Sequence, residues 1–250
     1  MKPTASLSRV PSLIALPIAA FSTACSPPDT SARLIAGPDT PRVSGTIDEA
    51  FTDRFVDAYE GSNRLAVTST GGEAVRALVM ARHLVPRELH LVIDDHCLSA
   101  CASLLLPAAD TVTFGPDAVV GMHISLAMAR RVYVRDFGTG DDCYVRSGDG
   151  ERQMYETAGR RPSFPDEVYD RLQPGPSRSE DIGDVCPRIE YDLTHQWWFP
   201  TSTQLRDLMG LEFTGTVCAD DPTCMRRRLP NLRMEGTVVV GDEIWTLPLE

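Results

Sequence analysis

The chain has 250 residues, of which 24 are basic and 35 acidic, so its formal net charge is −11. Lys2 is the single lysine; once a leader containing it is removed, no Schiff-base lysine, phosphate-loop lysine or serine–lysine dyad can operate. An acidic surface repels phosphate backbones, so we expect no nucleic-acid partner. Hydrophobic residues make up 42% of the chain, as in a soluble globular protein of one domain with insertions or a tail.

Residues 1–25 resemble a lipoprotein-type signal peptide. A positively charged start precedes the apolar run 13–21, which is shorter than the roughly 20 residues that span a bilayer. Small residues then precede Cys25, although Ser22 stands where such a box usually has leucine. We therefore expect export to the periplasm or cell envelope and a lipid anchor at Cys25 in the bilayer. Ordinary cleavage nearby is the alternative.

The cysteine count agrees with export. Seven cysteines less a lipidated Cys25 leave six, which in an oxidising compartment can form three disulfides in any of 15 connectivities. A competing zinc site at His96, Cys97 and Cys101 lacks a second chelating pair at the usual spacing, so we expect no metal. The disulfides that we predict are Cys97–Cys101, Cys143–Cys186 and Cys218–Cys224.

The first half of the chain reads as alternating strands and helices. Residues 26–42, rich in proline, serine and threonine, are typical of a flexible tether. Thr46 and Glu49 form a capping box that predicts a helix over 48–60. The predicted elements that follow are a strand at 64–69, a helix at 73–84, a strand at 89–93, a helix at 99–107, and strands at 111–114 and 119–123. Short connections between them indicate a parallel α/β domain over 43–214.

The pattern is weaker in the second half. Residues 129–195, with turn signals at Gly138-Thr139-Gly140 and Gly148-Asp149-Gly150, predict an irregular insertion whose helical part at 154–172 is broken by prolines. A helix at 203–209 follows. Residues 215–250 predict a disulfide-pinned C-terminal extension that ends in a hairpin of 237–240 with 243–247.

Three motifs stand in a characteristic order: Gly71-Gly72 between a strand and a helix, Ser99 between the next strand and helix, and His123 after a later strand. From Gly45 to His123, and more weakly over 205–214, the chain resembles the Clp-protease/crotonase fold superfamily. The Cys-x-Ser-Ala-Cys sequence around Ser99 is similar to that of the exported bacterial proteins related to the proteolytic subunit of the Clp protease. The resemblance implies repeated β-α-β units with mostly parallel sheets, and homo-oligomer formation.

The resemblance also implies the chemistry of an exported serine hydrolase, a peptidase acting on peptide or protein substrates without a cofactor. Ser99 at a helix N-terminus would form the acyl-enzyme, with His123 as general base. The backbone N–H groups of Gly72 and Ala100 would form the oxyanion hole. The family's third residue, an aspartate, falls where this chain has tryptophan, and the nearest carboxylate is Asp192. Asp192 reaches His123, or the pair acts as a dyad, or catalysis has been lost.

Each motif has a structural alternative. Ser99 can cap its helix, His123 can be a buried hydrogen-bonded histidine, and Gly71-Gly72 can be a turn. Two rival functions follow: a catalytically inactive Clp-fold protein that binds or scaffolds in the envelope, and a crotonase-type acyl-CoA enzyme. Export argues against the second rival, because CoA thioesters are cytosolic. With lysine excluded, any activity depends on His123.

Overall fold

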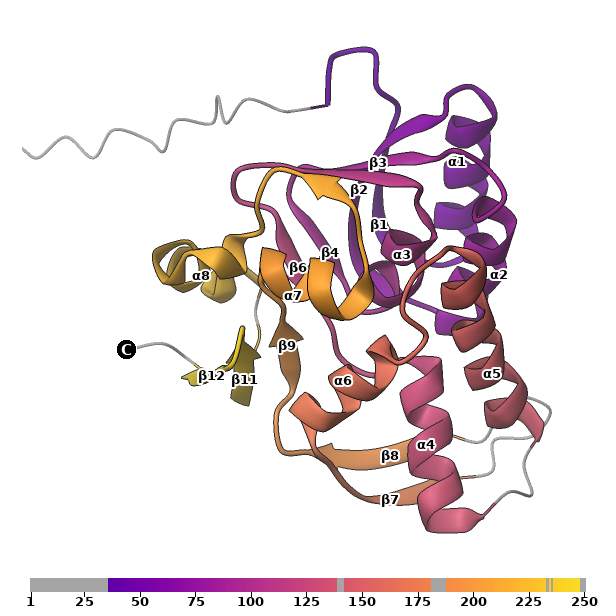
Figure 1. The fold of residues 1–250 in the computed structure, drawn as a ribbon, viewed down its shortest axis with the longest axis vertical. Helices are drawn as coiled ribbons and strands as arrows, with labels where there is room; N and C mark the ends of the chain where they lie inside the picture. The colour runs from indigo at the N-terminus through magenta and orange to yellow at the C-terminus, as the bar shows by residue number, and fades with distance from the viewer. Residues whose placement is uncertain (1–35, 139–141, 181–187, 233, 235, 248–250) are drawn as a thin grey trace, which may run out of the picture. The chain divides into compact units, whose positions relative to one another are not determined.

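The computed structural model describes residues 36–138, 142–180, 188–232, 234 and 236–247. A sheet of seven strands lies at the centre of the domain (Figure 1), in the order β10-β5-β3-β2-β4-β6 with β1 paired to β2. Its strands are β1 (Arg42–Ile47), β2 (Arg64–Gly72), β3 (His90–Ile93), β4 (His96–Leu98), β5 (Thr111–Phe114), β6 (Val119–Gly121) and β10 (Phe213–Thr214). All of its pairings are parallel, which confirms the predicted α/β class.

Two of the strands behave as one strand with an interruption. β3 and β4 are separated by Asp94-Asp95, and both pair with the same side of β2, through Val92 with Ala66 and Cys97 with Ser69. β5 and β6 repeat this arrangement next to them. The carboxyl ends of β2, β4 and β6 therefore meet at one edge of the sheet, where we expect the functional groups of a parallel sheet to lie.

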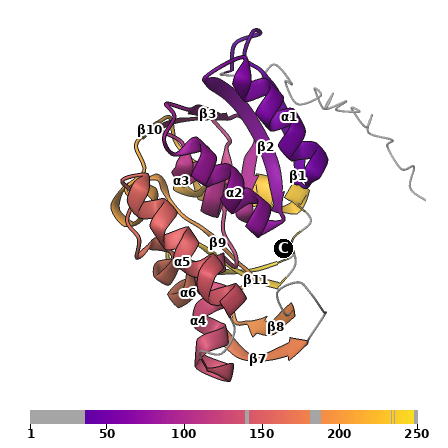
Figure 2. The same cartoon turned by 90° about the vertical axis from the view of Figure 1, so that its right-hand side faces the viewer.

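Helices cover the sheet as the apolar pattern predicts. Figure 2 shows α1 (Glu49–Glu60) and α2 (Ala74–Leu84) on the same face. The helix expected at 99–107 is a π-helical turn, Cys101–Leu105, that continues into α3 (Leu106–Ala108). The predicted capping box is wrong: the cap of α1 is Asp48, whose side chain accepts the N–H of Phe51 at 2.8 Å.

The insertion is more regular than its composition suggests. It contains three helices and a hairpin: α4 (Leu126–Phe137), α5 (Asp142–Thr157), α6 (Phe164–Leu172), β7 (Pro174–Glu180) and β8 (Arg188–Leu193). The turn expected at Gly148-Asp149-Gly150 lies inside α5. A side chain at Gly148 would approach Arg130 Cβ to 2.7 Å, so this glycine permits α5 to pack closely on α4.

A second, smaller sheet extends β6. It consists of β9 (Trp197–Phe199), β11 (Gly236–Val240) and β12 (Glu243–Leu247), and the β11–β12 hairpin is the predicted one. Met122 and Trp198 exchange two backbone hydrogen bonds of 2.8 Å, which join this sheet to the end of β6. Along the chain, β9 and β11 are separated by β10 of the main sheet and by several short helical elements. These are α7 (Ser202–Gln204), the π-helical turn Leu205–Met209, the 3-10 turn Cys218–Asp220, α8 (Pro222–Arg228) and the 3-10 turn Leu229–Leu232.

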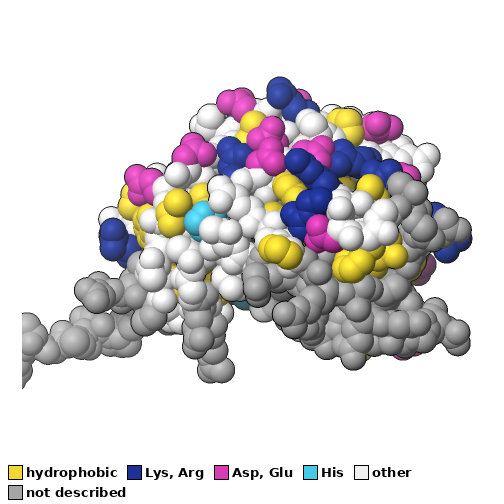
Figure 3. Space-filling model, turned by 90° about the horizontal axis from the view of Figure 1, so that it is seen from below, with side chains coloured by type: hydrophobic (Ala, Val, Ile, Leu, Met, Phe, Trp, Pro, Cys, Tyr) yellow, Lys and Arg dark blue, Asp and Glu magenta, His cyan; other side chains and the backbone are white. Residues whose placement is uncertain are grey.

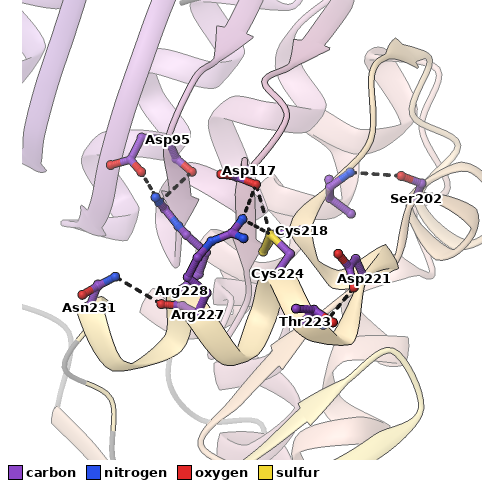
Figure 4. The surroundings of a disulfide bond; sticks show 11 residues. Asp95, Asp117, Ser202, Cys218, Asp221, Thr223, Cys224, Arg227, Arg228 and Asn231 are labelled. Atoms are coloured by element: carbon purple, nitrogen blue, oxygen red, sulfur yellow. Dashed lines mark hydrogen bonds and ion pairs between the residues drawn. A yellow bond between two sulfur atoms is a disulfide. The ribbon is translucent and has the colours of Figure 1, made fainter. Parts of the chain in front are cut away.

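The C-terminal extension is tied to the main sheet (Figure 4). The predicted disulfide Cys218–Cys224 is present, Arg227 pairs with Asp117 at 2.7 Å, and Arg228 pairs with Asp95 between β3 and β4. These contacts hold α8 against the strand interruption. The arginine cluster at the end of α8 therefore serves as partners for acidic residues of the sheet.

The predicted disulfide Cys97–Cys101 is also present, so these two sulfurs are bonded to each other and do not form the competing zinc set. Cys143 is disulfide-bonded too, but its predicted partner Cys186 lies outside the described residues. The predicted leader and Cys25 lie outside them as well. Ala36, within the predicted tether 26–42, is buried. In the part of the chain that the structure describes, no helix is long and apolar enough to span a membrane.

The surface carries charges of both signs. Figure 3 shows arginine and carboxylate side chains side by side on the face seen from below. Among the pairs on α4, α5 and α6, Arg152 bonds Asp166 at 2.9 Å and Arg131 lies 3.4 Å from the same carboxylate. Much of the arginine charge is thus neutralised locally, which fits a net acidic chain.

The cap of α1 can be tested by substitution. Asp48→Ala should lower the free energy of unfolding by about 1 kcal/mol, because the first turn of α1 loses its acceptor. Thr46→Ala is the matched control and should have a smaller effect, since Thr46 bonds only the exposed Thr70 hydroxyl, at 3.4 Å. Urea unfolding measures the free energy of unfolding of both variants. A larger loss for Thr46→Ala than for Asp48→Ala would contradict capping by Asp48.

Candidate functional site

Ser99 occupies the junction between β4 and the π-helical turn, with a backbone φ of +55°. Its N–H donates to the carbonyl of Gly121 at 2.8 Å, and its own carbonyl accepts the N–H of Ser103 at 2.9 Å. Left-handed backbone is costly for a residue other than glycine and concentrates at functional sites. Among the described residues, only Gln173 shares it outside glycine, and Gln173 is the C-cap of α6.

The Ser99 hydroxyl does not cap the helix. The turn that follows begins without a side-chain cap, and no hydrogen bond within the described ranges involves Ser99 Oγ. A capping role therefore explains neither the presence of serine here nor its strained backbone. The hydroxyl stays available at the edge of the sheet.

The double glycine is packed directly against this serine. A side chain at Gly71, where φ is +90°, would place its Cβ 2.9 Å from Ser99 Oγ and 2.8 Å from the Leu98 carbonyl oxygen. Gly71 donates its N–H to Ser69 Oγ at 3.1 Å, while Gly72 lies in register with Ile47 of β1. Both glycines belong to the end of β2 rather than to a free turn, and they are required for close approach.

The Cys97–Cys101 disulfide encloses Ser99. Both cysteines are fully buried, one in β4 and the other at the start of the π-helical turn. The disulfide joins the residues on either side of the serine and so limits how far the strained junction can relax. The motif thus contributes to the geometry of the site.

His123 lies two residues after the end of β6, the strand next to β4. Its ring packs edge-on against Trp197, with 4.6 Å between ring centroids. Burial lowers the pKa of His123 to about 4, so the imidazole is neutral at neutral pH. No hydrogen bond from a described residue reaches the ring, so the alternative of a hydrogen-bonded core histidine also has no support.

The structure does not supply the third residue. Asp192 lies in β8, but its side chain is outside the described part of the chain. His195, the other polar residue nearby in sequence, is buried, with no hydrogen-bond partner for Nδ1. Trp197 instead packs against His123, and in the sequence tryptophan stands at the position of the expected aspartate.

A cavity of about 640 Å³ is lined by residues next to these groups, although neither Ser99 nor His123 lines it. Three of its lining residues are neighbours of the site: Thr70 precedes Gly71, Leu98 precedes Ser99, and Trp197 contacts His123. Its other lining residues are Gln196, Leu232, Met234 and Gly236, so the C-terminal extension and β9 supply one wall. The lining is about equally polar and apolar. Nothing in the sequence predicted that residues between 196 and 236 would line a cavity near the segment of Ser99.

The close approach of Gly71 to Ser99 makes a testable prediction. Gly71→Ala should lose about 2 kcal/mol more of unfolding free energy than Gly159→Ala, because both glycines have positive φ but only Gly71 has atoms in the way. Chemical denaturation of the two variants measures the difference. Equal losses would mean that Gly71 is required only for its backbone conformation.

Comparison with known proteins gives similarity of fold. No family model matches the chain, and no curated protein matches its sequence. Similar solved structures include the ClpP protease catalytic domain from Plasmodium falciparum, with 8% identity, 70% of this chain and 84% of that chain covered, and a TM-score of 0.38. They also include a mutant ClpP1 from Listeria monocytogenes, with 12% identity, 70% and 90% covered, and a TM-score of 0.39. At these values the similarities carry no argument about activity, export or assembly.

Proposed function

We propose that this protein is an exported, Clp-like serine hydrolase that cleaves peptide bonds through an acyl-enzyme on Ser99. The observation that carries the proposal is the serine itself, held at a φ of +55° with an unbonded hydroxyl beside the strand that leads to His123. Strained serines between a strand and a helix are characteristic of nucleophiles, because the turn exposes Oγ.

The reaction would begin with attack of Ser99 Oγ on the substrate carbonyl carbon, as a ring nitrogen of His123 takes the hydroxyl proton. Collapse of the tetrahedral intermediate breaks the C–N bond and returns that proton to the leaving amine. Water then attacks the ester carbonyl carbon as His123 takes its proton. Collapse of this second intermediate breaks the bond between the acyl carbon and Ser99 Oγ and returns the proton to Oγ. With no lysine beyond Lys2, His123 is the base that the site offers.

Two backbone N–H groups are suited to the oxyanion. Ala100 lies in the first turn of its helix, where an N–H has no intrahelical acceptor. Glu73 donates its N–H to Ile47 of β1 at 2.9 Å, and successive N–H groups of a strand point to opposite edges. The N–H of Gly72 is thereby directed to the edge that carries β4 and Ser99, which supports its role as the second donor.

The cavity supports a peptide as the substrate class, because its lining can both contact apolar side chains and hydrogen-bond a peptide backbone. Leu98, Trp197 and Leu232 line it, and two polar residues, Thr70 and Gln196, offer hydrogen bonds. The homo-oligomer expected from the family resemblance stays a prediction.

A second candidate, a binding or scaffolding protein without catalysis, is favoured by Trp197. The tryptophan ring packs on His123 where a carboxylate would orient the imidazole and stabilise its charged form. Without that charge, and with a lowered pKa, His123 is a weak base.

Ser99 labelling separates the two candidates. A fluorophosphonate probe should label the wild-type protein at pH 8, where His123 is neutral, and Ser99→Ala should abolish the labelling. Ser44→Ala, at an exposed serine of β1, is the matched control and should label normally. A folded wild-type protein that stays unlabelled would favour the scaffolding protein.

We further propose that the chain is exported and lipid-anchored through Cys25. The Cys97–Cys101 and Cys218–Cys224 disulfides support an oxidising compartment. Radioactive palmitate should label the full chain expressed in a bacterium, and Cys25→Ser should remove the label and release the protein from membranes. A Cys25→Ser protein that is still labelled would contradict anchoring at this residue.

A further inference from the structure

Glu151 is a carboxylate buried completely inside the insertion, on α5. Its Oε2 accepts the N–H of Ala127 at 2.6 Å, in the first turn of α4, while Oε1 accepts no hydrogen bond from any residue that the structure describes. The Ser125 hydroxyl and the Leu126 N–H also favour its charged form. Glu151 thus holds the N-terminus of α4, where a negative charge is favourable.

The start of α4 is close to His123 in the chain. Ser125, two residues beyond His123, is the N-cap of α4 and accepts the N–H of Met128 at 3.2 Å. On the other side of His123, Met122 is fixed to Trp198 by two hydrogen bonds. The short segment that carries His123 is therefore held at one end by β9 and at the other by the cap of α4.

The same helix also reaches the segment that carries the serine. Tyr155, one turn after Glu151, is fully buried and donates its hydroxyl to the Ser103 carbonyl at 2.9 Å. Ser103 in turn bonds the carbonyl of Ser99 through both its N–H and its hydroxyl. α5 is thus connected to the Ser99 segment through Tyr155 and to the His123 segment through Glu151.

The burial of Glu151 costs stability. Desolvation raises its pKa to about 7, only partly opposed by the α4 donors and by Arg152, whose guanidinium is bonded to Asp166 at 2.9 Å. Tyr155 is the other titratable group that interacts with it. Because the folded-state pKa lies above the ordinary value, stability present below about pH 4.5 is lost as the pH rises through about 7.

We propose that Glu151 is a positioning residue, whose buried carboxyl group fixes the first turn of α4 and so holds His123 in place for reaction with Ser99. Since burial favours the neutral carboxyl, ionisation favours opening of this cap and loosens the His123 segment. The inference rests on the proposed function for its catalytic consequence, but the coupling between Glu151 and His123 can be measured without any activity.

The C2 proton of His123, assigned by its absence in His123→Asn, reports this coupling in NMR spectra. In the wild type we expect two steps as the pH is varied, one near pH 4 from His123 itself and one near pH 7 from Glu151. Glu151→Gln should remove the upper step and keep the lower one. Glu156→Gln, on the exposed side of the same helix, is the matched control and should keep both.

Labelling of Ser99 tests the catalytic consequence. Glu151→Ala, which removes the acceptor for the Ala127 N–H, should slow fluorophosphonate labelling by about tenfold at pH 8. Glu151→Gln, which keeps a neutral acceptor, should label at least as fast as the wild type and remove any inflection of the rate near pH 7. If the wild type is not labelled at any pH, the proposed function fails, while the His123 resonance still decides the coupling. A wild-type His123 resonance that is flat between about pH 6 and about pH 8 overturns the proposal, even if the Glu151 variant fails to fold.

Discussion

The parallel pairing of β4 between β2 and β6 determines where every candidate group lies. Because carboxyl ends of parallel strands meet at one edge, the segments that carry Gly71, Ser99 and His123 lie at that edge although up to 52 residues separate them in the sequence. Within the described residues, no hydrogen bond joins Ser99 to His123. Asp94-Asp95 separates β4 from β3, and Arg228 of the C-terminal extension is bonded to Asp95. The extension therefore stabilises β4, the strand that leads to Ser99, and also lines the cavity next to Leu98.

The identity of the base limits the chemistry. Lysine is excluded beyond Lys2, and the His123 ring is desolvated with Trp197 against it. In a serine triad the acid contributes up to about 10⁴ in kcat, because it stabilises the imidazolium. If the site reacts as a dyad, it is a slow one. The rate then depends on how well the His123 segment is positioned, which is the role inferred for Glu151 and for the hydrogen bonds between Met122 and Trp198.

Local patterns in the sequence were sufficient for β2, β3, β5 and β6 of the main sheet, for α1 and α2 and for the last hairpin, because hydrophobic periodicity and turn residues determine such elements. They also placed Gly71, Ser99 and His123 in order, but they did not predict the short strands β1, β4 and β10. They failed where tertiary contacts decide: Asp48 caps α1 in place of Thr46, and the insertion is helical despite its glycines. The buried Glu151 depends on contacts with segments distant in sequence, so no local pattern could reveal it.

The glycines of α5 have a consequence for how the insertion forms. Gly148 and Gly150 lie in the interior of a helix, where each lowers helix stability by about 1 kcal/mol relative to alanine. Gly148 faces Arg130 Cβ and the Ala127 backbone of α4, which leave no room for a larger residue. Gly150 faces Arg82 and Leu78 of α2, where a larger residue would have to displace the Arg82 guanidinium. α5 is thus a poor helix alone and a well-fitted one between its neighbours. Its formation should be coupled to docking, so the groups it brings behind Ser99 and His123 are assembled only when the rest of the domain has folded.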